Sequence, residues 1–347
     1  EDAWRMTHER RVEYQDLSIG TFVFEVESVD RDLSYSAAPA TTRLIIHPPY
    51  MLIALIGGLS IALVGFVIAA RTSLKRRRER DQAQAELIQT QAQLVQEMDK
   101  ELQTAHEMQV GLLPKSPPRL PDAVLSGLCL PANHVGGDYY NFLFLDDAQT
   151  LLGIVLADVS GKAMQAATVA MRLNEILRYE SQNRTSTTGI LKGVDASLRG
   201  QIPSDMFVTC GIGILDITKK TIQFASAASP PIYHFVANRG VVEAHTVPGF
   251  PLGMSLDLGT EEPFQTVEMN MQLGDVLVLV SDGVEDAQNG RDEFYEGERL
   301  SKVIEGVARK GVSAEALRDA IAADVKRFIG NTPQTDDLTI IVLRIDD

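Results

Sequence analysis

The longest apolar stretch of the chain runs from residue 51 to residue 70, with the sequence MLIALIGGLSIALVGFVIAA and no charged side chain. At ~1.5 Å per residue, a helix over this stretch is about 30 Å long, which matches the hydrocarbon core of a bilayer. A basic cluster between Arg71 and Arg80 comes directly after the stretch. The pattern predicts a transmembrane helix over residues 50–70, and the positive-inside rule places the chain beyond residue 71 in the cytoplasm.

Alternating apolar and polar residues precede this span. Residues 21–30, TFVFEVESVD, and residues 41–49, TTRLIIHPP, read as half-buried strands, the second ended by prolines. Residues 11–20, RVEYQDLSIG, suggest a third strand. Three strands are too few to bury a core alone. Residues 1–48 are therefore expected to be the C-terminal part of a larger extracytoplasmic β-sandwich, with more chain preceding Glu1.

Helix-forming residues dominate the segment after the span. Residues 71–113 are rich in Ala, Gln, Glu and Leu, and neither Gly nor Pro occurs between Leu74 and Val110. Heptad positions a and d are half polar, with Gln91 at an a position and Glu101 at a d position. This pattern fits a weak parallel coiled coil, which would make the chain a homodimer, or an ordinary linker helix.

Aspartates recur at the ends of apolar strands in the remaining part, residues 114–347. Asp138 follows two glycines in HVGGDYYNF. Asp158 ends the apolar run of LLGIVLADVSGK, and Asp282 follows VLVLVS. Asp336 and Asp337 begin the last strand in QTDDLTIIVLRI.

One aspartate at a strand end is usually a turn or cap residue, but four in such settings suggest a shared site. Converging carboxylates repel each other unless cations lie between them. Without accompanying Cys or His, oxygen ligands favour Mg²⁺ or Mn²⁺. Two such ions ~3.5–4 Å apart would lower the pKa of a bridging water and hold phosphoryl oxygens for in-line attack. Gly136 and Gly137 would clear room for an ion.

Composition narrows the function classes. The formal net charge of −15 argues against binding nucleic acid through its phosphates. The two cysteines, Cys129 and Cys210, form no disulfide framework. A metal-dependent enzyme that handles phosphate remains compatible with both observations.

Residues from about 104 to 345 resemble the SpoIIE/RsbU-like branch of the metal-dependent Ser/Thr protein phosphatases, the PPM family. The segments that carry the resemblance occur in the family's order: MQVGLLPKSPPRLP, PANHVGGDYYNF, LADVSGKAMQAA, MFVTCGIGILD, GFPLGM, GDVLVLVSDGVEDAQN and TDDLTIIVLR. The stretch before the membrane span, around YQDLSIGTFVFEVESVDRD, is similar to the end of a Y-Y-Y-type β-sandwich sensor domain.

The resemblance implies an α+β fold, an α-β-β-α sandwich in residues 114–347, and a set of site residues. Asp158 would bridge two Mn²⁺ or Mg²⁺ ions, with the backbone carbonyl of Val159 as a further ligand. The remaining ligands would be Asp138, Asp282 and Asp336, and the four aspartates would act in catalysis through metal-bound water. Supporting or phosphate-contacting positions would be Asp337, Gly137, Gly161, Lys162 and Gly283.

The sequence departs from the family pattern at three places. Asn141 stands where a second Asp is usual, Ala163 stands where Gly is common, and SAASPP at residues 226–231 replaces NAGHPP. None of these changes removes an expected ligand. The altered segment nevertheless motivates an alternative hypothesis, in which the protein is a catalytically weak pseudophosphatase that acts as a signal-responsive binding module.

The expected function is that of a receptor phosphatase, single-pass in the bacterial inner membrane with its enzyme domain in the cytoplasm. It would hydrolyse phosphoserine or phosphothreonine on a cytoplasmic regulatory protein, by family analogy an anti-sigma-factor antagonist of the STAS type.

Overall fold

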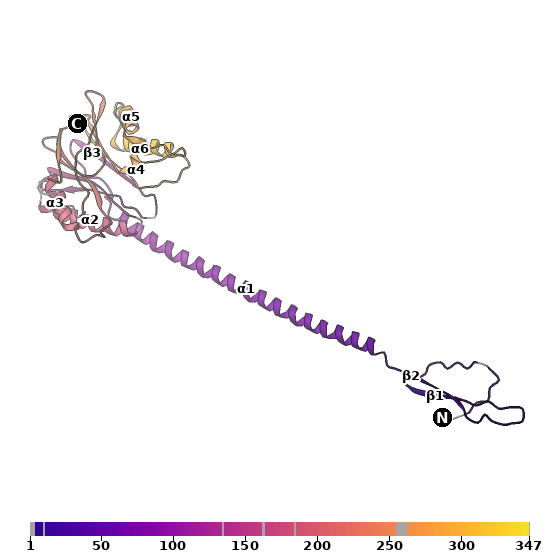
Figure 1. The fold of residues 1–347 in the computed structure, drawn as a ribbon. Helices are drawn as coiled ribbons and strands as arrows, with labels where there is room; N and C mark the ends of the chain where they lie inside the picture. Colours follow the sequence, from indigo (N-terminus) through magenta and orange to yellow (C-terminus); the bar gives the residue numbers. More distant parts are fainter. Residues whose placement is uncertain are drawn as a thin grey trace. The chain divides into compact units, whose positions relative to one another are not determined.

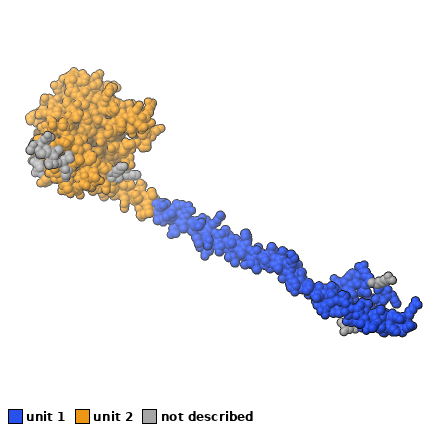
Figure 2. Space-filling model, in the orientation of Figure 1, with its two compact units in different colours: residues 1–92 blue, residues 93–347 orange. Residues whose placement is uncertain are grey.

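The computed structural model describes residues 4–9, 11–133, 135–161, 164–183, 185–254 and 262–346. The chain divides into two compact units, residues 1–92 and residues 93–347 (Figure 2).

A two-stranded antiparallel sheet forms the first part of the chain. It pairs β1 (Gly20–Val26) with β2 (Ala40–Ile46), and Phe22 lies opposite Leu44. The third strand predicted over residues 11–20 is wrong, because residues 11–19 form no strand. Asp16 has a φ of 57°, which interrupts extended backbone. The ring of Tyr14 instead lies 4.8 Å from that of Phe24.

One continuous helix, α1 (Tyr50–Val110), contains both the apolar stretch and most of the predicted helical linker. Its apolar window is long and hydrophobic enough to cross a membrane, and its side chains there are exposed. Only near its end does α1 bury side chains, those of Ala105 and Gln109. The helix therefore presents apolar surface to its surroundings in its first part, and its last turns bury side chains within the second unit.

Two five-stranded sheets form the centre of the second unit. In spatial order, the first contains β10 (Thr266–Asn270), β7 (Thr221–Ala227), β6 (Val208–Asp216), β5 (Leu151–Val159) and β4 (Tyr139–Phe144). The second contains β3 (Ala123–Leu130), β12 (Leu338–Ile345), β11 (Val276–Val280), β8 (Ile232–Val236) and β9 (Val241–His245).

Helices cover the outer face of each sheet (Figure 1). The first sheet carries α2 (Met164–Asn183) and α3 (Thr187–Leu198). The second carries α5 (Glu296–Ala308) and α6 (Ala314–Ile329), with the short α4 (Asp282–Glu285) following β11. The predicted α-β-β-α sandwich is thus confirmed.

Three apolar layers hold the sandwich together. Between the sheets, Ile154 of β5 packs in one cluster with Leu277 of β11 and Ile341 of β12, and all three are fully buried. Val155 of β5 packs on the opposite side, under α2 and α3. Strands that are buried on both faces need apolar residues at every position, which explains the unbroken apolar runs of β5 and β11.

Candidate metal centre

The predicted site aspartates lie at the ends of paired strands, one pair in each sheet. In the first sheet, β4 begins where β5 ends, and Tyr139 pairs with Ala157. Asp138 and Asp158 are therefore neighbours across that strand pair. In the second sheet, β12 begins where β11 ends, with Ile340 opposite Val280. Asp282 follows β11, and Asp336 precedes β12. The sandwich thus supplies two carboxylates from each sheet.

Close backbone approach explains the two glycines before Asp138. A Cβ on Gly137 would lie 2.4 Å from the carbonyl oxygen of Val159 and 2.6 Å from Oδ1 of Asp158. A Cβ on Gly136 would lie 1.8 Å from Oδ2 of Asp337. Any side chain here would push the loop away from both sheets, so glycine is required at both positions.

Asp337 organises the loop that carries Asp138. Its Oδ2 accepts hydrogen bonds from the backbone N–H of Gly137 at 2.7 Å and of Asp138 at 3.3 Å, and its Oδ1 accepts one from Ala132 at 2.8 Å. Gly283 packs against the carbonyl of Asp337, since a Cβ there would lie 2.1 Å from that oxygen. Asp337 therefore joins the end of the second sheet to the loop of the first.

Two hydroxyl residues that the sequence reasoning missed complete this connection. Thr339 Oγ1 donates to Oδ2 of the buried Asp138 at 2.5 Å. Ser281 Oγ accepts from the N–H of Thr339 at 3.0 Å and donates to the carbonyl of Asp337 at 3.2 Å. Both residues lie close in the sequence to predicted site aspartates. The contact of Thr339 with Asp138 becomes visible only in the structure, where the two sheets pack face to face.

Burial is the largest cause that raises the pKa of each of these four carboxylates, and neighbouring acidic charges add to it. For Asp158, burial and then the charges of Asp282 and Asp336 raise the pKa to about 7. Burial, followed by the charge of Asp158, raises the pKa of Asp138 well above its usual range. The pKa values of Asp282 and Asp336 are also raised, first by burial. Asp158 thus feels the charges of Asp282 and Asp336 from the second sheet, and its own charge acts on Asp138 in the first sheet.

The donor set suits a hard divalent cation. Four carboxylates supply only oxygen, and such ligands favour Mg²⁺ or Mn²⁺. The Val159 carbonyl lies beside Gly137 at the same loop. A cation here would remove the repulsion that raises the four pKa values. The residues present therefore fit the divalent cations that the sequence predicts.

Two further predicted site residues, Gly161 and Lys162, come shortly after β5 in the sequence. Gly161 follows β5 with a φ of 114°, a conformation that favours glycine. Lys162 and Ala163 lie outside the described residues. A cleft lined by Gly283, Gln334 and Asp336, together with neighbouring residues, opens beside the second-sheet carboxylates.

Two of the departures from the family pattern, Asn141 and the segment 226–231, lie among the described residues, and neither replaces a predicted ligand. Asn141 points away from it, because its side chain donates to the hydroxyl of Tyr139 at 2.7 Å. In the altered segment, Ala228 has a φ of 57°, so alanine occupies the left-handed conformation for which glycine is better suited. Ser226 and Ser229 close this turn through their hydroxyls, 2.9 Å apart.

The end of α1 contacts the same loop. Gln109 is buried, its Nε2 donates to the carbonyl of Gly136 at 2.7 Å, and its Oε1 accepts from the N–H of Gly136 at 3.1 Å. The helix therefore holds the residue that precedes Gly137 through both of its backbone groups.

We predict that Gly137→Ala abolishes the rise in melting temperature that MnCl₂ causes in the full chain in detergent. The added methyl group displaces the loop from Val159 and Asp158. Gly306→Ala in α5, where a Cβ meets no atom within 4 Å, is the control and should respond to Mn²⁺ as the wild type does. An equal Mn²⁺ response in both variants would contradict the close-approach argument.

We also predict that Asp158→Asn raises the melting temperature of the metal-free protein at about pH 8. A carboxylate whose folded-state pKa is raised is disfavoured when ionised, so its cost is fully present above about pH 7 and disappears as the pH falls towards ~4. The gain from the substitution should therefore shrink at about pH 5. Asp147→Asn, a change of the same charge at an exposed position, is the matched control. A loss of stability in Asp158→Asn at pH 8 would disprove the repulsion.

Sequence comparison identifies proteins that are similar to this chain. The family description "Stage II sporulation protein E (SpoIIE)" matches residues 148–346, more than half of the chain. Phosphoserine phosphatase RsbU of Bacillus subtilis is 25% identical over 256 residues, which cover 74% of this chain and 73% of RsbU. Protein IcfG of Synechocystis is 24% identical, but the match covers only 41% of its length.

Solved structures show the same fold. The SiaA-PP2C domain of Pseudomonas aeruginosa has a TM-score of 0.61 at 20% identity, covering 72% of this chain and 97% of that domain. The RsbU and RsbW domains of Rv1364c from Mycobacterium tuberculosis give 0.56 at 22% identity, covering 68% of this chain and 63% of that one. The shared architecture is that of PP2C phosphatase domains. Together with the match over residues 148–346, it establishes that the chain belongs to the SpoIIE family.

Proposed function

We propose that this protein is a membrane-anchored, metal-dependent protein serine/threonine phosphatase. The observation that carries the proposal is the position of four carboxylates at the ends of paired strands, two in each sheet, where burial raises all four pKa values and the charges of Asp282 and Asp336 raise that of Asp158 further. Membership of the SpoIIE family and similarity to a phosphoserine phosphatase support the same activity.

The carboxylates of Asp138, Asp158, Asp282 and Asp336, with the carbonyl of Val159, would hold two Mg²⁺ or Mn²⁺ ions. Such ions supply Lewis acidity and make water a nucleophile at neutral pH. The chain itself provides position. Thr339 orients Asp138 by its hydrogen bond, and Asp337 fixes the loop beneath it. Gly137 allows its loop to approach Asp158 and Val159 closely.

Membrane anchoring is supported by the apolar part of α1. The window is long and hydrophobic enough to span a bilayer, and the basic residues directly after it favour a cytoplasmic phosphatase unit. We place the protein in a bacterial inner membrane as a single-pass receptor. The half-polar heptads of α1 would join two copies as a homodimer.

The proposed substrate is a cytoplasmic phosphoprotein, specifically a regulatory protein of the STAS type. RsbU, a relative of 25% identity, is itself named a phosphoserine phosphatase. The net charge of −15 disfavours nucleic acid as a partner. The pseudophosphatase alternative rests only on the altered segment at Ala228 and its neighbours, and that segment contributes none of the proposed ligands.

A signal could reach the site through Gln109. Its two hydrogen bonds hold Gly136, which is adjacent to Gly137 and packed on Asp337. A shift of the end of α1 would break these bonds and release the loop that carries Asp138. Regulation would then act on the completeness of the metal centre, through a two-state movement of one helix end.

We expect Asp158→Asn and Asp282→Ala to reduce Mn²⁺-dependent hydrolysis of p-nitrophenyl phosphate and of a phosphoserine peptide to background. Each substitution removes a carboxylate from the proposed ligand set. Asp147→Asn changes the same charge at an exposed position and should keep wild-type activity. Wild-type rates in both site variants would refute the assignment, whereas a wild type that binds Mn²⁺ without turnover would favour the pseudophosphatase.

Gln109→Ala should raise the Mn²⁺ concentration needed for half-maximal activity several-fold. The substitution leaves the N–H and carbonyl of Gly136 without their partners, a cost of about 1–3 kcal/mol for each buried group. Gln103→Ala, exposed on the same helix, is the matched control. If the two variants require the same Mn²⁺ concentration, the helix end does not govern the loop.

A further inference from the structure

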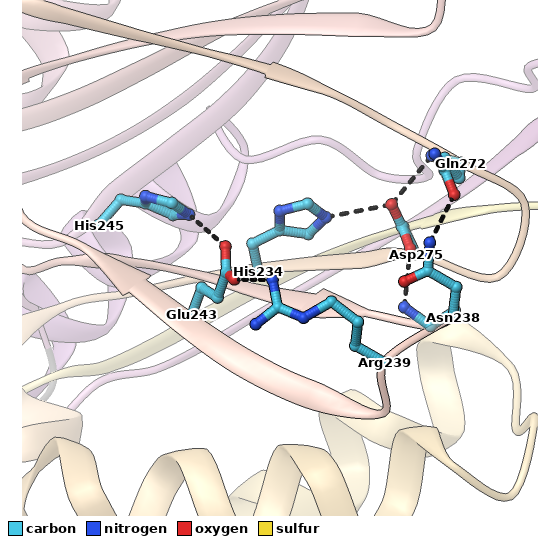
Figure 3. Close-up of polar contacts among 8 residues, drawn as sticks. His234, Asn238, Arg239, Glu243, His245, Gln272 and Asp275 are labelled. Carbon is cyan, nitrogen blue, oxygen red and sulfur yellow. Dashed lines mark hydrogen bonds and ion pairs between the residues drawn. The ribbon is translucent and has the colours of Figure 1, made fainter.

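Three potential metal ligands lie together on the hairpin of β8 and β9, within the second sheet. His234 on β8 pairs directly with Glu243 on β9. His245 is two residues further along β9, so it projects from the same face of the strand as Glu243. One ligand atom from each of the three side chains lies within 4.8 Å of the other two. Among the described residues, this is the group that meets that spacing (Figure 3).

The buried Asp275 fixes the orientation of the His234 ring. His234 Nε2 lies 3.2 Å from Oδ2 of Asp275. Asp275 is held in turn by the backbone N–H groups of Ala237 at 2.8 Å and Gln272 at 2.9 Å. An acid that accepts from one ring nitrogen leaves the other, Nδ1, with its lone pair free. This carboxylate–histidine arrangement is the usual support of a metal-bound imidazole.

Figure 3 shows the second nitrogen of the His234 ring on the side turned towards His245 and Glu243. Asp275 therefore does more than fill the core, because it directs a free nitrogen at the other two side chains.

His245 contributes a buried nitrogen without a partner. Its Nε2 is shielded from solvent and forms no hydrogen bond in the described structure, although it lies 3.8 Å from Oε2 of Glu243. A buried polar atom left unsatisfied has a free-energy cost of about 1–3 kcal/mol. The other oxygen of Glu243, Oε1, forms an ion pair with Arg239, which leaves Oε2 facing His245.

We propose that His234, Glu243 and His245 form a second metal site, which binds a divalent transition-metal ion of the Zn²⁺ type. Two imidazoles and one carboxylate favour Zn²⁺ over the harder Mg²⁺ and Mn²⁺. Tetrahedral Zn²⁺ with bonds of ~2.0–2.1 Å places its ligand atoms roughly 3.4 Å apart. The 3.8 Å between Glu243 and His245 needs to close only slightly.

The site is reachable from solvent. The side chain of His245 is 27% exposed and that of Glu243 is 36% exposed, whereas His234 is buried. The fourth position of the ion would face outward and hold water. By joining two strands, the ion would tie β9, the edge strand of its sheet, to β8. Its effect would be to stabilise the fold by an amount that rises with the logarithm of the free metal concentration once that concentration exceeds the dissociation constant.

Calorimetric titration of the full chain with ZnCl₂, in detergent and with excess MgCl₂ to occupy the acidic centre, tests the site. We expect one Zn²⁺ equivalent whose dissociation constant rises at least tenfold in His245→Ala and in Glu243→Gln. Co²⁺ should give the visible absorption bands of a tetrahedral site in the wild type, and these bands should be lost in both variants.

Two controls keep the result specific. Asp158→Asn removes a ligand of the acidic centre, and His47→Ala removes a histidine outside the hairpin, so both should bind Zn²⁺ as the wild type does. Melting temperatures without metal verify that the hairpin variants fold. Unchanged Zn²⁺ affinity in both hairpin variants would overturn the proposal, as would loss of the Zn²⁺ equivalent in Asp158→Asn.

Discussion

Repulsion between buried carboxylates is the constraint on which the enzyme unit depends. Each of the two sheets is held by its own strand pairing and apolar faces. Together they place aspartates at their strand ends in surroundings where burial already disfavours the charged form. The apolar layer around Ile154, Leu277 and Ile341 must outweigh this repulsion in the absence of a cation. The architecture thus uses hydrophobic burial to hold an electrostatically unfavourable cluster, as is typical of binding and catalytic sites.

Neutral hydrogen-bond donors organise the cluster. Asp337 accepts three backbone N–H groups, and Asp138 accepts the hydroxyl of Thr339. These bonds come from neutral donors, so they position the carboxylates without supplying a positive charge. The hairpin site differs in kind, because its histidines and single carboxylate carry little net charge and suit a softer ion.

Much of the sandwich could be predicted from the sequence, because its central strands are covered on both faces and read as unbroken apolar runs. The aspartates were found for a related reason, since each lies at or next to one end of an apolar strand. Thr339 and Gln109 could not be found this way. Each forms its hydrogen bond with a residue that is distant in the sequence, and no pattern in the sequence predicts that contact. The hairpin ligands were missed because they come together only through strand pairing, which places His234 opposite Glu243. The extra strand near Asp16 was wrong because alternation alone does not reveal a left-handed residue.

The division of the acidic cluster between two sheets has a consequence for folding. A chain in which both sheets have formed but not yet docked presents only half of the carboxylates at each edge. The proposed cation binding would therefore require the assembled layers, because neither sheet alone supplies more than two of the four carboxylates. Ions bound in this position would act as a clasp that delays separation of the layers, so they should slow unfolding far more than they hasten the formation of either sheet.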